Sequence, residues 1–160
     1  MPPSRRRASV AAVVAAAGLA LIAAAPAPAA IIEVGKIAVD HTPSCPASPC
    51  LAVSRTTGYQ AKVGADRGLF VVPQNGKIVA WSITLGTPGD KQVQFFDDNL
   101  GGPASARITI LHPRKKLVSV VTGQSPVQQL QPYFGTTVQF PLGRALNVKK
   151  GYVIALTVPT

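Results

Sequence analysis

The sequence is poor in the residue types that perform catalysis. Its 160 residues include only six acidic side chains, two histidines and two cysteines. A glycoside hydrolase needs two carboxylates that face each other across the scissile bond, whereas the adjacent Asp97 and Asp98 would point to opposite faces of a strand. The Gly-x-Ser-x-Gly motif of one large class of hydrolases is also absent. We therefore predict a protein that is not an enzyme and uses no cofactor.

Two acidic clusters leave alternatives open. Asp97, Asp98 and Asn99 offer oxygen ligands for calcium, although they lack the alternating acidic pattern and closing glutamate of a calcium-binding loop. Asp40 and His41 would contribute to a hydrolase only if groups from other elements converged on them in one pocket. Ordinary surface turns are the better interpretation of both clusters.

Helical patterns are scarce as well. After the first thirty residues, no window of ten or more shows a period of 3.6, and the 15 prolines of the chain argue against long helices. Alternation with a period of two is common instead. It is clearest in 76–86, where Val79, Trp81, Ile83 and Leu85 fall on one face of an extended strand. This pattern predicts that the single tryptophan lies in the core of a β-sheet protein.

The segment before this strand predicts a hairpin. Pro73-Gln74-Asn75-Gly76 contains residues that tolerate the positive φ angles of a tight turn. Residues 69–72 should therefore pair with 77–85. Other extended runs with turn residues between them are expected at 31–39, 51–54, 59–63, 91–96, 106–110, 117–121, 136–142 and 152–158.

Short strands at this spacing predict an all-β fold. A two-sheet antiparallel sandwich of the jelly-roll type, after an N-terminal signal helix, fits the pattern best, and a small closed barrel is the alternative. Residues 56–58 are expected as a turn, and 123–135 as the longest irregular connection. Because the chain stops at Thr160 directly after its last expected strand, the sequence leaves open whether it continues.

The first 29 residues have the pattern of an export signal. Arg5, Arg6 and Arg7 precede the apolar stretch 8–25, and small residues near Ala29 suit a signal peptidase. A retained membrane anchor formed by 8–25 is the alternative, although this stretch is mostly alanine. We expect a secreted, extracellular protein.

The remaining chain, 30–160, is expected to form one domain. Its first part, 30–50, contains a strand and a proline-rich loop that a disulfide between Cys45 and Cys50 would close; the sandwich would follow in 51–160. So short a ring contributes about 2 kcal/mol, which makes it a local staple. With the signal removed, 13 basic residues stand against six acidic residues, a net charge of +7.

That charge predicts attraction to anionic surfaces. Arg114, Lys115 and Lys116 in one turn and Lys149 and Lys150 in another would form a cationic rim if both turns lay at the same end of the sandwich. Lysines that keep a β protein soluble are the competing explanation. Specific nucleic-acid binding is not expected, because the sequence offers no recognition helix.

Aromatic residues give a second candidate for ligand contact. Tyr133 and Phe134 lie in a connection rich in glutamine and proline, where an exposed pair would stack on a ligand and a buried pair would close one end of the fold. Tyr152 alternates with Ile154 and Leu156, so core packing is its better interpretation.

Two stretches carry a resemblance. Residues 70–81, Phe-Val-Val-Pro-Gln-Asn-Gly-Lys-Ile-Val-Ala-Trp, and 146–156, Leu-Asn-Val-Lys-Lys-Gly-Tyr-Val-Ile-Ala-Leu, together with the connection 125–135, resemble an uncharacterised family of secreted β-sandwich proteins of high-GC bacteria. No activity is assigned to that family. The resemblance implies the fold and export, and it implies no catalytic residue.

Three functions follow as hypotheses. The first is a non-enzymatic domain that adheres to anionic envelope polymers or glycans through a basic face. The second is a structural or protein-interaction module of the cell envelope. The third is a hydrolase, which the composition favours least.

Overall fold

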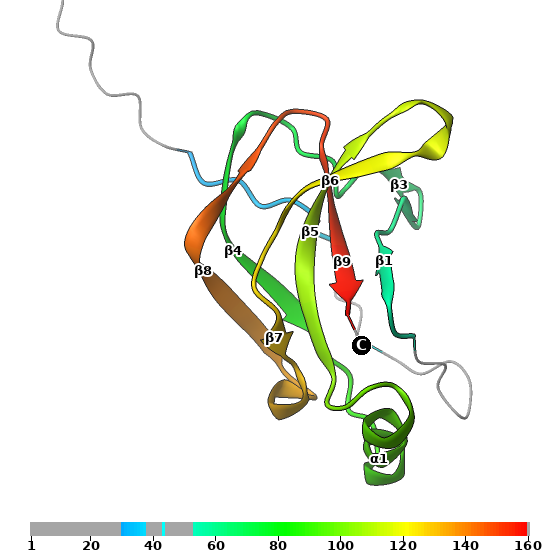
Figure 1. The fold of residues 1–160 in the computed structure, drawn as a ribbon. Coiled ribbons are helices and arrows are strands. Elements are labelled where there is room, and N and C mark those ends of the chain that lie inside the picture. The colour runs from blue at the N-terminus through cyan, green and yellow to red at the C-terminus, as the bar shows by residue number, and fades with distance from the viewer. Residues whose placement is uncertain (1–29, 38–42, 44–52, 160) are drawn as a thin grey trace, which may run out of the picture. The chain divides into compact units, whose positions relative to one another are not determined.

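The computed structural model describes residues 30–37, 43 and 53–159, and the fold below is that of the unit Ile32–Thr160. This part of the chain is mostly antiparallel β-structure, as the sequence predicts (Figure 1). Its elements in chain order are β1 (Thr56–Gly58), β2 (Lys62–Val63), β3 (Asp66–Arg67), β4 (Gly76–Thr84), α1 (Asp90–Asn99), β5 (Ser105–Pro113), the 3-10 helix η1 (Lys115–Leu117), β6 (Ser119–Gln124), β7 (Gln128–Gln129), the 3-10 helix η2 (Gln131–Tyr133), β8 (Thr137–Val148) and β9 (Val153–Val158).

Several predictions fall outside the described residues. They concern the signal segment 1–29 with its helix, the anchor alternative 8–25, and the disulfide between Cys45 and Cys50. Asp40 and His41, on which the hydrolase alternative depends, lie outside as well. All of these stay predictions.

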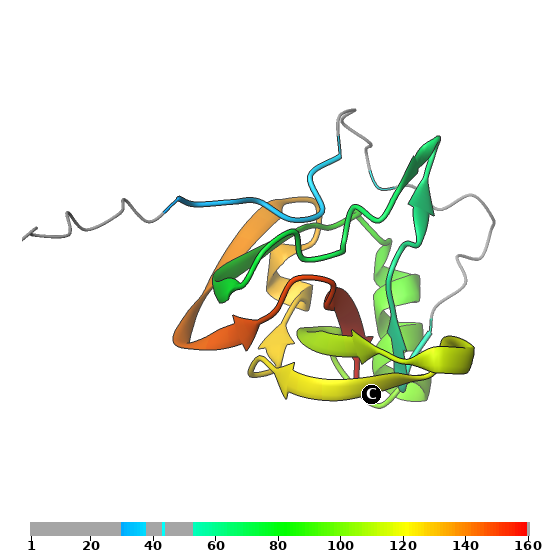
Figure 2. The same cartoon turned by 90° about the horizontal axis from the view of Figure 1, so that it is seen from above.

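The largest sheet has the strand order β1-β9-β5-β6, and β7 pairs with the beginning of β5. All its neighbours run antiparallel. A second sheet consists of β4 and β8, and β2 and β3 form a separate pair. Figures 1 and 2 show β4 and β8 side by side, on one side of β5 and β9.

The main core lies between β4–β8 and the larger sheet. Trp81 of β4 is only 8% exposed, and its ring centroid lies 4.8 Å from that of Phe140, its partner on β8. Ala106 and Ile108 of β5 and Leu130 complete this cluster. Burial of each large apolar side chain contributes about 1.5–3 kcal/mol. The predicted burial of the tryptophan is confirmed.

The alternation predicted for β4 is wrong at its first half. Ile78 packs into the core, whereas Val79 is 62% exposed. The cause lies in β8: Ile78 pairs with Leu146 and Ala80 with Pro141, so 142–145 stand opposite Val79 alone. An irregularity of this kind breaks the period of two and turns the strand.

The predicted hairpin between 69–72 and 77–85 is also wrong. Val71 forms a bridge with Val153, and the Val72 amide donates to the Tyr152 carbonyl at 2.8 Å. Neither Asn75 nor Gly76 has a positive φ angle. The chain therefore crosses from the edge of β9 to β4, instead of folding back on itself.

The segment predicted as an extended run at 91–96 belongs to the helix α1. Gly89 is the N-cap residue, and Asp90 places a negative charge in the first turn, where it interacts favourably with the helix dipole. The helix has no buried residue, and Phe95 is 54% exposed. Val93, Phe96 and Leu100 are half-buried at the i, i+3, i+7 spacing of a helix face, a spacing that the prediction of an extended run overlooked.

Three connections also differ from expectation. Residues 56–58, predicted as a turn, form β1 and pair with β9. The stretch 123–135, predicted to be irregular, contains β7 and η2. The strand predicted at 117–121 begins only at Ser119, because 115–117 form η1.

Candidate anion-binding surface

The register of β5 and β9 places the two basic turns at one end of the sheet. Leu111, near the end of β5, pairs with Val153, the first residue of β9. The turn that contains Arg114, Lys115 and Lys116 follows β5, and the turn that contains Lys149 and Lys150 precedes β9 (Figure 1). Both basic turns therefore lie at the same end of the sheet, which is the arrangement that a cationic rim requires.

A sixth basic residue, Lys77, lies at the same end. It pairs with Asn147 near the end of β8, beside the second turn. The side-chain oxygen of Asn75 accepts a hydrogen bond from the backbone amide of Lys150 at 2.9 Å and so ties the start of β4 to that turn. Sequence reasoning missed Lys77 because it assigned 73–76 to a hairpin turn with a different partner.

We call these six residues the basic end. All six are exposed, and the segments that carry them, 73–77, 113–119 and 147–152, contain no acidic residue. Positive charges gathered on one surface raise the local concentration of anions. This attraction weakens as the ionic strength rises. The basic end consists of Lys77, Arg114, Lys115, Lys116, Lys149 and Lys150.

The acidic residues of α1 lie toward the opposite end. The helix connects the end of β4 to the beginning of β5, and Figure 1 shows it at the far end of the sheet from both basic turns. Asp90, Asp97 and Asp98 therefore do not neutralise the basic end. The other acidic residues of the described part, Glu33 and Asp66, lie in 30–37 and in β3, outside the three basic segments.

Backbone hydrogen bonds hold the second basic turn in place. The Gly151 amide donates to the Val72 carbonyl at 2.9 Å, and the Tyr152 amide donates to the Lys149 carbonyl at 3.0 Å. Gly151 has a φ angle of +85°, in the left-handed region that glycine adopts without strain. Lys149 and Lys150 thus project from an anchored backbone.

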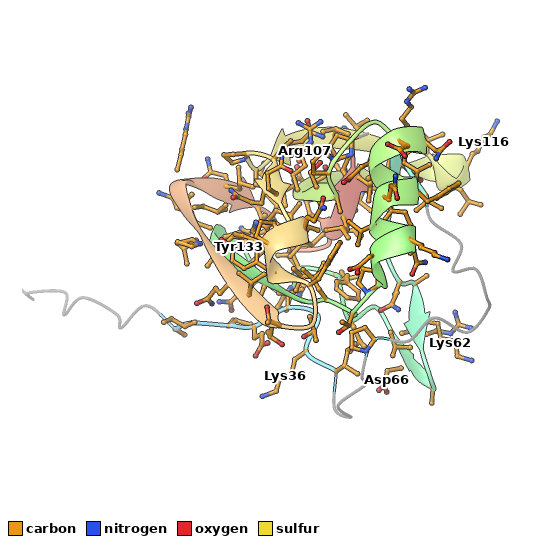
Figure 3. All side chains as sticks on the ribbon, turned by 90° about the horizontal axis from the view of Figure 1, so that it is seen from below. Lys36, Lys62, Asp66, Arg107, Lys116 and Tyr133 are labelled. Atoms are coloured by element: carbon orange, nitrogen blue, oxygen red, sulfur yellow. The ribbon has the colours of Figure 1, made fainter. Side chains whose placement is uncertain are left out.

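The first basic turn is the tip of the β5–β6 hairpin. The Arg114 amide donates to the Val118 carbonyl at 2.7 Å, which closes the turn. Lys116 extends outward from the hairpin in Figure 3, away from Arg107 and Tyr133. Leu117 next to it is fully exposed. The tip therefore presents cations and an apolar side chain together.

Tyr133 and Phe134 lie at the other end of the fold. They follow β7, which pairs with the beginning of β5. The Tyr133 ring meets Phe140 edge to face, with ring centroids 5.6 Å apart, and Phe134 is half-buried. Tyr133 is nevertheless 39% exposed, so the pair helps to close this end of the core and also leaves one ring open to a ligand. The pair is not brought together with the basic residues.

The calcium candidate occupies the last turn of α1. The Asp97 carboxylate accepts a hydrogen bond from the Gln131 amide at 3.3 Å, and the Asn99 amide donates to the Phe95 carbonyl at 3.0 Å. Consecutive helical residues point in directions about 100° apart, so Asp97, Asp98 and Asn99 do not converge. Within the described residues, no group of three histidine, cysteine or acidic side chains is placed to hold a metal ion.

Two further aromatic residues, His112 and Tyr152, pack against each other. His112 lies in β5, and its ring stacks on Tyr152 with centroids 4.6 Å apart. Tyr152 also packs against the cluster around Ile110, in agreement with its predicted core role.

Among the described helices, none combines the length and apolarity needed to cross a bilayer.

Comparison with known protein families, curated proteins and solved structures finds no match. The resemblance of 70–81 and 146–156 to a secreted β-sandwich family therefore stays a prediction. The function has to be argued from the charges and shape of the chain itself.

Proposed function

We propose that this protein is an exported, non-enzymatic domain that adheres to anionic polymers or glycans of the cell envelope through the basic end. The observation that carries the proposal is the meeting of three separate segments, each with basic residues, at one end of the sheet. Their distance from the acids of α1 makes this end a localised cationic surface. The export pattern of 1–29 supports a location outside the cytoplasm.

A two-layer sandwich is the architecture that we propose for this domain. The packing of Trp81 and Phe140 against Ala106 and Ile108 supports two layers around one core. A jelly-roll connectivity remains part of this proposal, on the strength of the strand spacing in the sequence.

The first test is binding to heparin as an anionic glycan, with dextran as a neutral control, at two salt concentrations. A basic-end variant carries Lys115→Gln, Lys116→Gln, Lys149→Gln and Lys150→Gln. A matched variant removes four charges elsewhere, at Lys36, Lys62, Arg67 and Lys91. We expect heparin binding that weakens with salt, and no dextran binding. The basic-end variant alone should lose about tenfold in affinity, which corresponds to roughly 0.35 kcal/mol for each of four exposed charge contacts.

Equal losses in the two variants would show that net charge, and not the basic end, attracts the glycan. Binding that ignores salt, or no binding to any anionic polymer, would contradict the proposal outright. Circular dichroism of each variant checks that the fold is retained.

A specific observation also supports the second hypothesis, a protein-interaction module. β6 is the outer strand of the largest sheet, and Val120 and Val121 on it are 46% and 53% exposed. An uncharged edge strand with exposed valines favours pairing with a strand of another chain. Analytical ultracentrifugation of the wild type and of Val121→Lys tests this: association that the lysine abolishes favours it, and a monomer at all concentrations counts against it.

A further inference from the structure

The tip of the β5–β6 hairpin combines features that a soluble polyanion does not need. Leu117 is the most exposed large apolar side chain of the described residues, at 105% relative exposure, and the adjacent Val118 is 56% exposed. Arg114, Lys115 and Lys116 directly precede them. A charged polymer in water attracts the cations but offers nothing to the leucine.

The backbone holds this leucine outward. Lys116 and Leu117 both have φ angles of +59°, in the left-handed region that residues other than glycine rarely adopt. Such conformations persist only where the surrounding structure imposes them, and they concentrate at functional positions. Here the hydrogen bond from the Arg114 amide to the Val118 carbonyl closes the turn around them.

An anionic lipid surface would use both features. Its headgroups attract lysine and arginine, at roughly fivefold in affinity per cation near the surface. The boundary between headgroups and acyl chains takes up apolar side chains that project from a polar surface. Burial of a leucine there adds about tenfold or more.

We propose that the β5–β6 tip inserts Leu117 into the surface of an anionic lipid bilayer while Arg114, Lys115 and Lys116 bind the headgroups. The proposal rests on the proposed function for its electrostatic part, because the same basic end would make the first contact. It goes further in naming a lipid surface and in assigning a role to an uncharged residue. The contact is peripheral, since only the tip of this hairpin enters the surface of the bilayer.

The test measures co-sedimentation of the full chain with vesicles of phosphatidylcholine alone and of phosphatidylcholine with phosphatidylglycerol. Leu117→Ser removes the inserting side chain. Val79→Ser, at a 62% exposed valine on β4, removes a comparable apolar side chain away from the tip. We expect binding to the anionic vesicles only, about tenfold weaker for Leu117→Ser and unchanged for Val79→Ser. Heparin binding should be unchanged in both variants.

Insertion itself is read from the fluorescence of Leu117→Trp with brominated lipids, which quench an indole only within the bilayer. The wild type supplies the control, because its one tryptophan, Trp81, is 8% exposed in the core. We expect quenching of Leu117→Trp and none of the wild type.

The outcomes separate the two proposals. Heparin binding without vesicle binding, or Leu117→Ser as tight on vesicles as the wild type, would overturn insertion and leave the proposed function intact. Loss of both ligands in Leu117→Ser would also overturn insertion, because the leucine would then act on the turn and not in the lipid. If neither heparin nor anionic vesicles bind, the proposed function itself fails.

Discussion

The irregularity between β4 and β8 reverses which of two adjacent residues, Ile78 or Val79, a simple alternation would bury. This reversal can be tested. A strand of period two that includes Trp81 would bury Val79 and expose Ile78, whereas the structure packs Ile78 between two core clusters and leaves Val79 62% exposed. Ile78→Ala should therefore destabilise the domain by about 2 kcal/mol, the lower end for a large aliphatic side chain because this one is only partly buried. Val79→Ala should cost about 0.5 kcal/mol or less.

Urea denaturation followed by the fluorescence of Trp81 measures both variants, since this residue is the only tryptophan and lies in the core. With a typical urea dependence of unfolding, Ile78→Ala should lower the midpoint by roughly 1 M, and Val79→Ala should barely move it. Equal losses, or a larger loss for Val79→Ala, would refute the register between these strands. An unchanged slope of the transition in both variants is the control for two-state unfolding.

Two further substitutions test local features by the same denaturation assay. Gly35→Ala should destabilise the domain by roughly 2 kcal/mol, because its φ angle is +87° and the added Cβ would lie 2.6 Å from the Phe70 ring. Gly151→Ala has a similar φ angle but nothing within 4 Å, so it should cost only about 1 kcal/mol. Thr109→Val should cost about 1–2 kcal/mol, because this fully buried hydroxyl shares hydrogen bonds with two side chains. Thr84→Val, at an exposed hydroxyl pair, should cost about 0.5 kcal/mol or less.

Each of these pairs has a result that would contradict it. If Gly35→Ala destabilised the domain no more than Gly151→Ala, the close approach of Phe70 to Gly35 would not contribute to the cost of the substitution. A neutral Thr109→Val would mean that the row of hydroxyls across β1, β9 and β5 is not needed to satisfy buried polar groups. This row joins Thr57, Thr157 and Thr109, with oxygen separations of 2.8 and 2.6 Å.

The sequence predicted the β class and the core role of Trp81 because strand alternation is a local signal. Prediction from the sequence failed where pairing between segments far apart in the chain determines the structure. The proline, asparagine and glycine of 73–76 looked like a hairpin turn, but the partner of 69–72 is β9, more than eighty residues later. The wide irregularity opposite Val79 is set by β8, which no pattern within β4 reveals.

The helix α1 was missed for a different reason. Its apolar stripe, Val93, Phe96 and Leu100, has helical spacing but spans only about two turns and is half-buried, and the adjacent Phe95 is exposed, so the pattern was also compatible with a short strand. The N-terminal sequence Pro88-Gly89-Asp90 was the available signal, because an acidic residue after a turn is typical of a first helical turn.

The basic end was partly predictable. Both basic turns were identified from their residues, but their meeting at one end depends on the antiparallel register of β5 and β9. Lys77 joins them through the pairing of β4 with β8, and the left-handed backbone that exposes Leu117 has no signal in its residue types. The composition suggested attraction to anions, whereas only the tertiary structure shows which basic residues lie together at the basic end.

The most direct measurement of this account is a nuclear magnetic resonance titration of the isotope-labelled chain with a heparin oligosaccharide. We predict that the amide signals of 75–77, 114–118 and 149–151 shift together with one affinity, and that those of α1 and η2 do not move. Shifts centred on α1 or on Tyr133, or spread evenly over all basic residues, would contradict a single binding surface at the basic end.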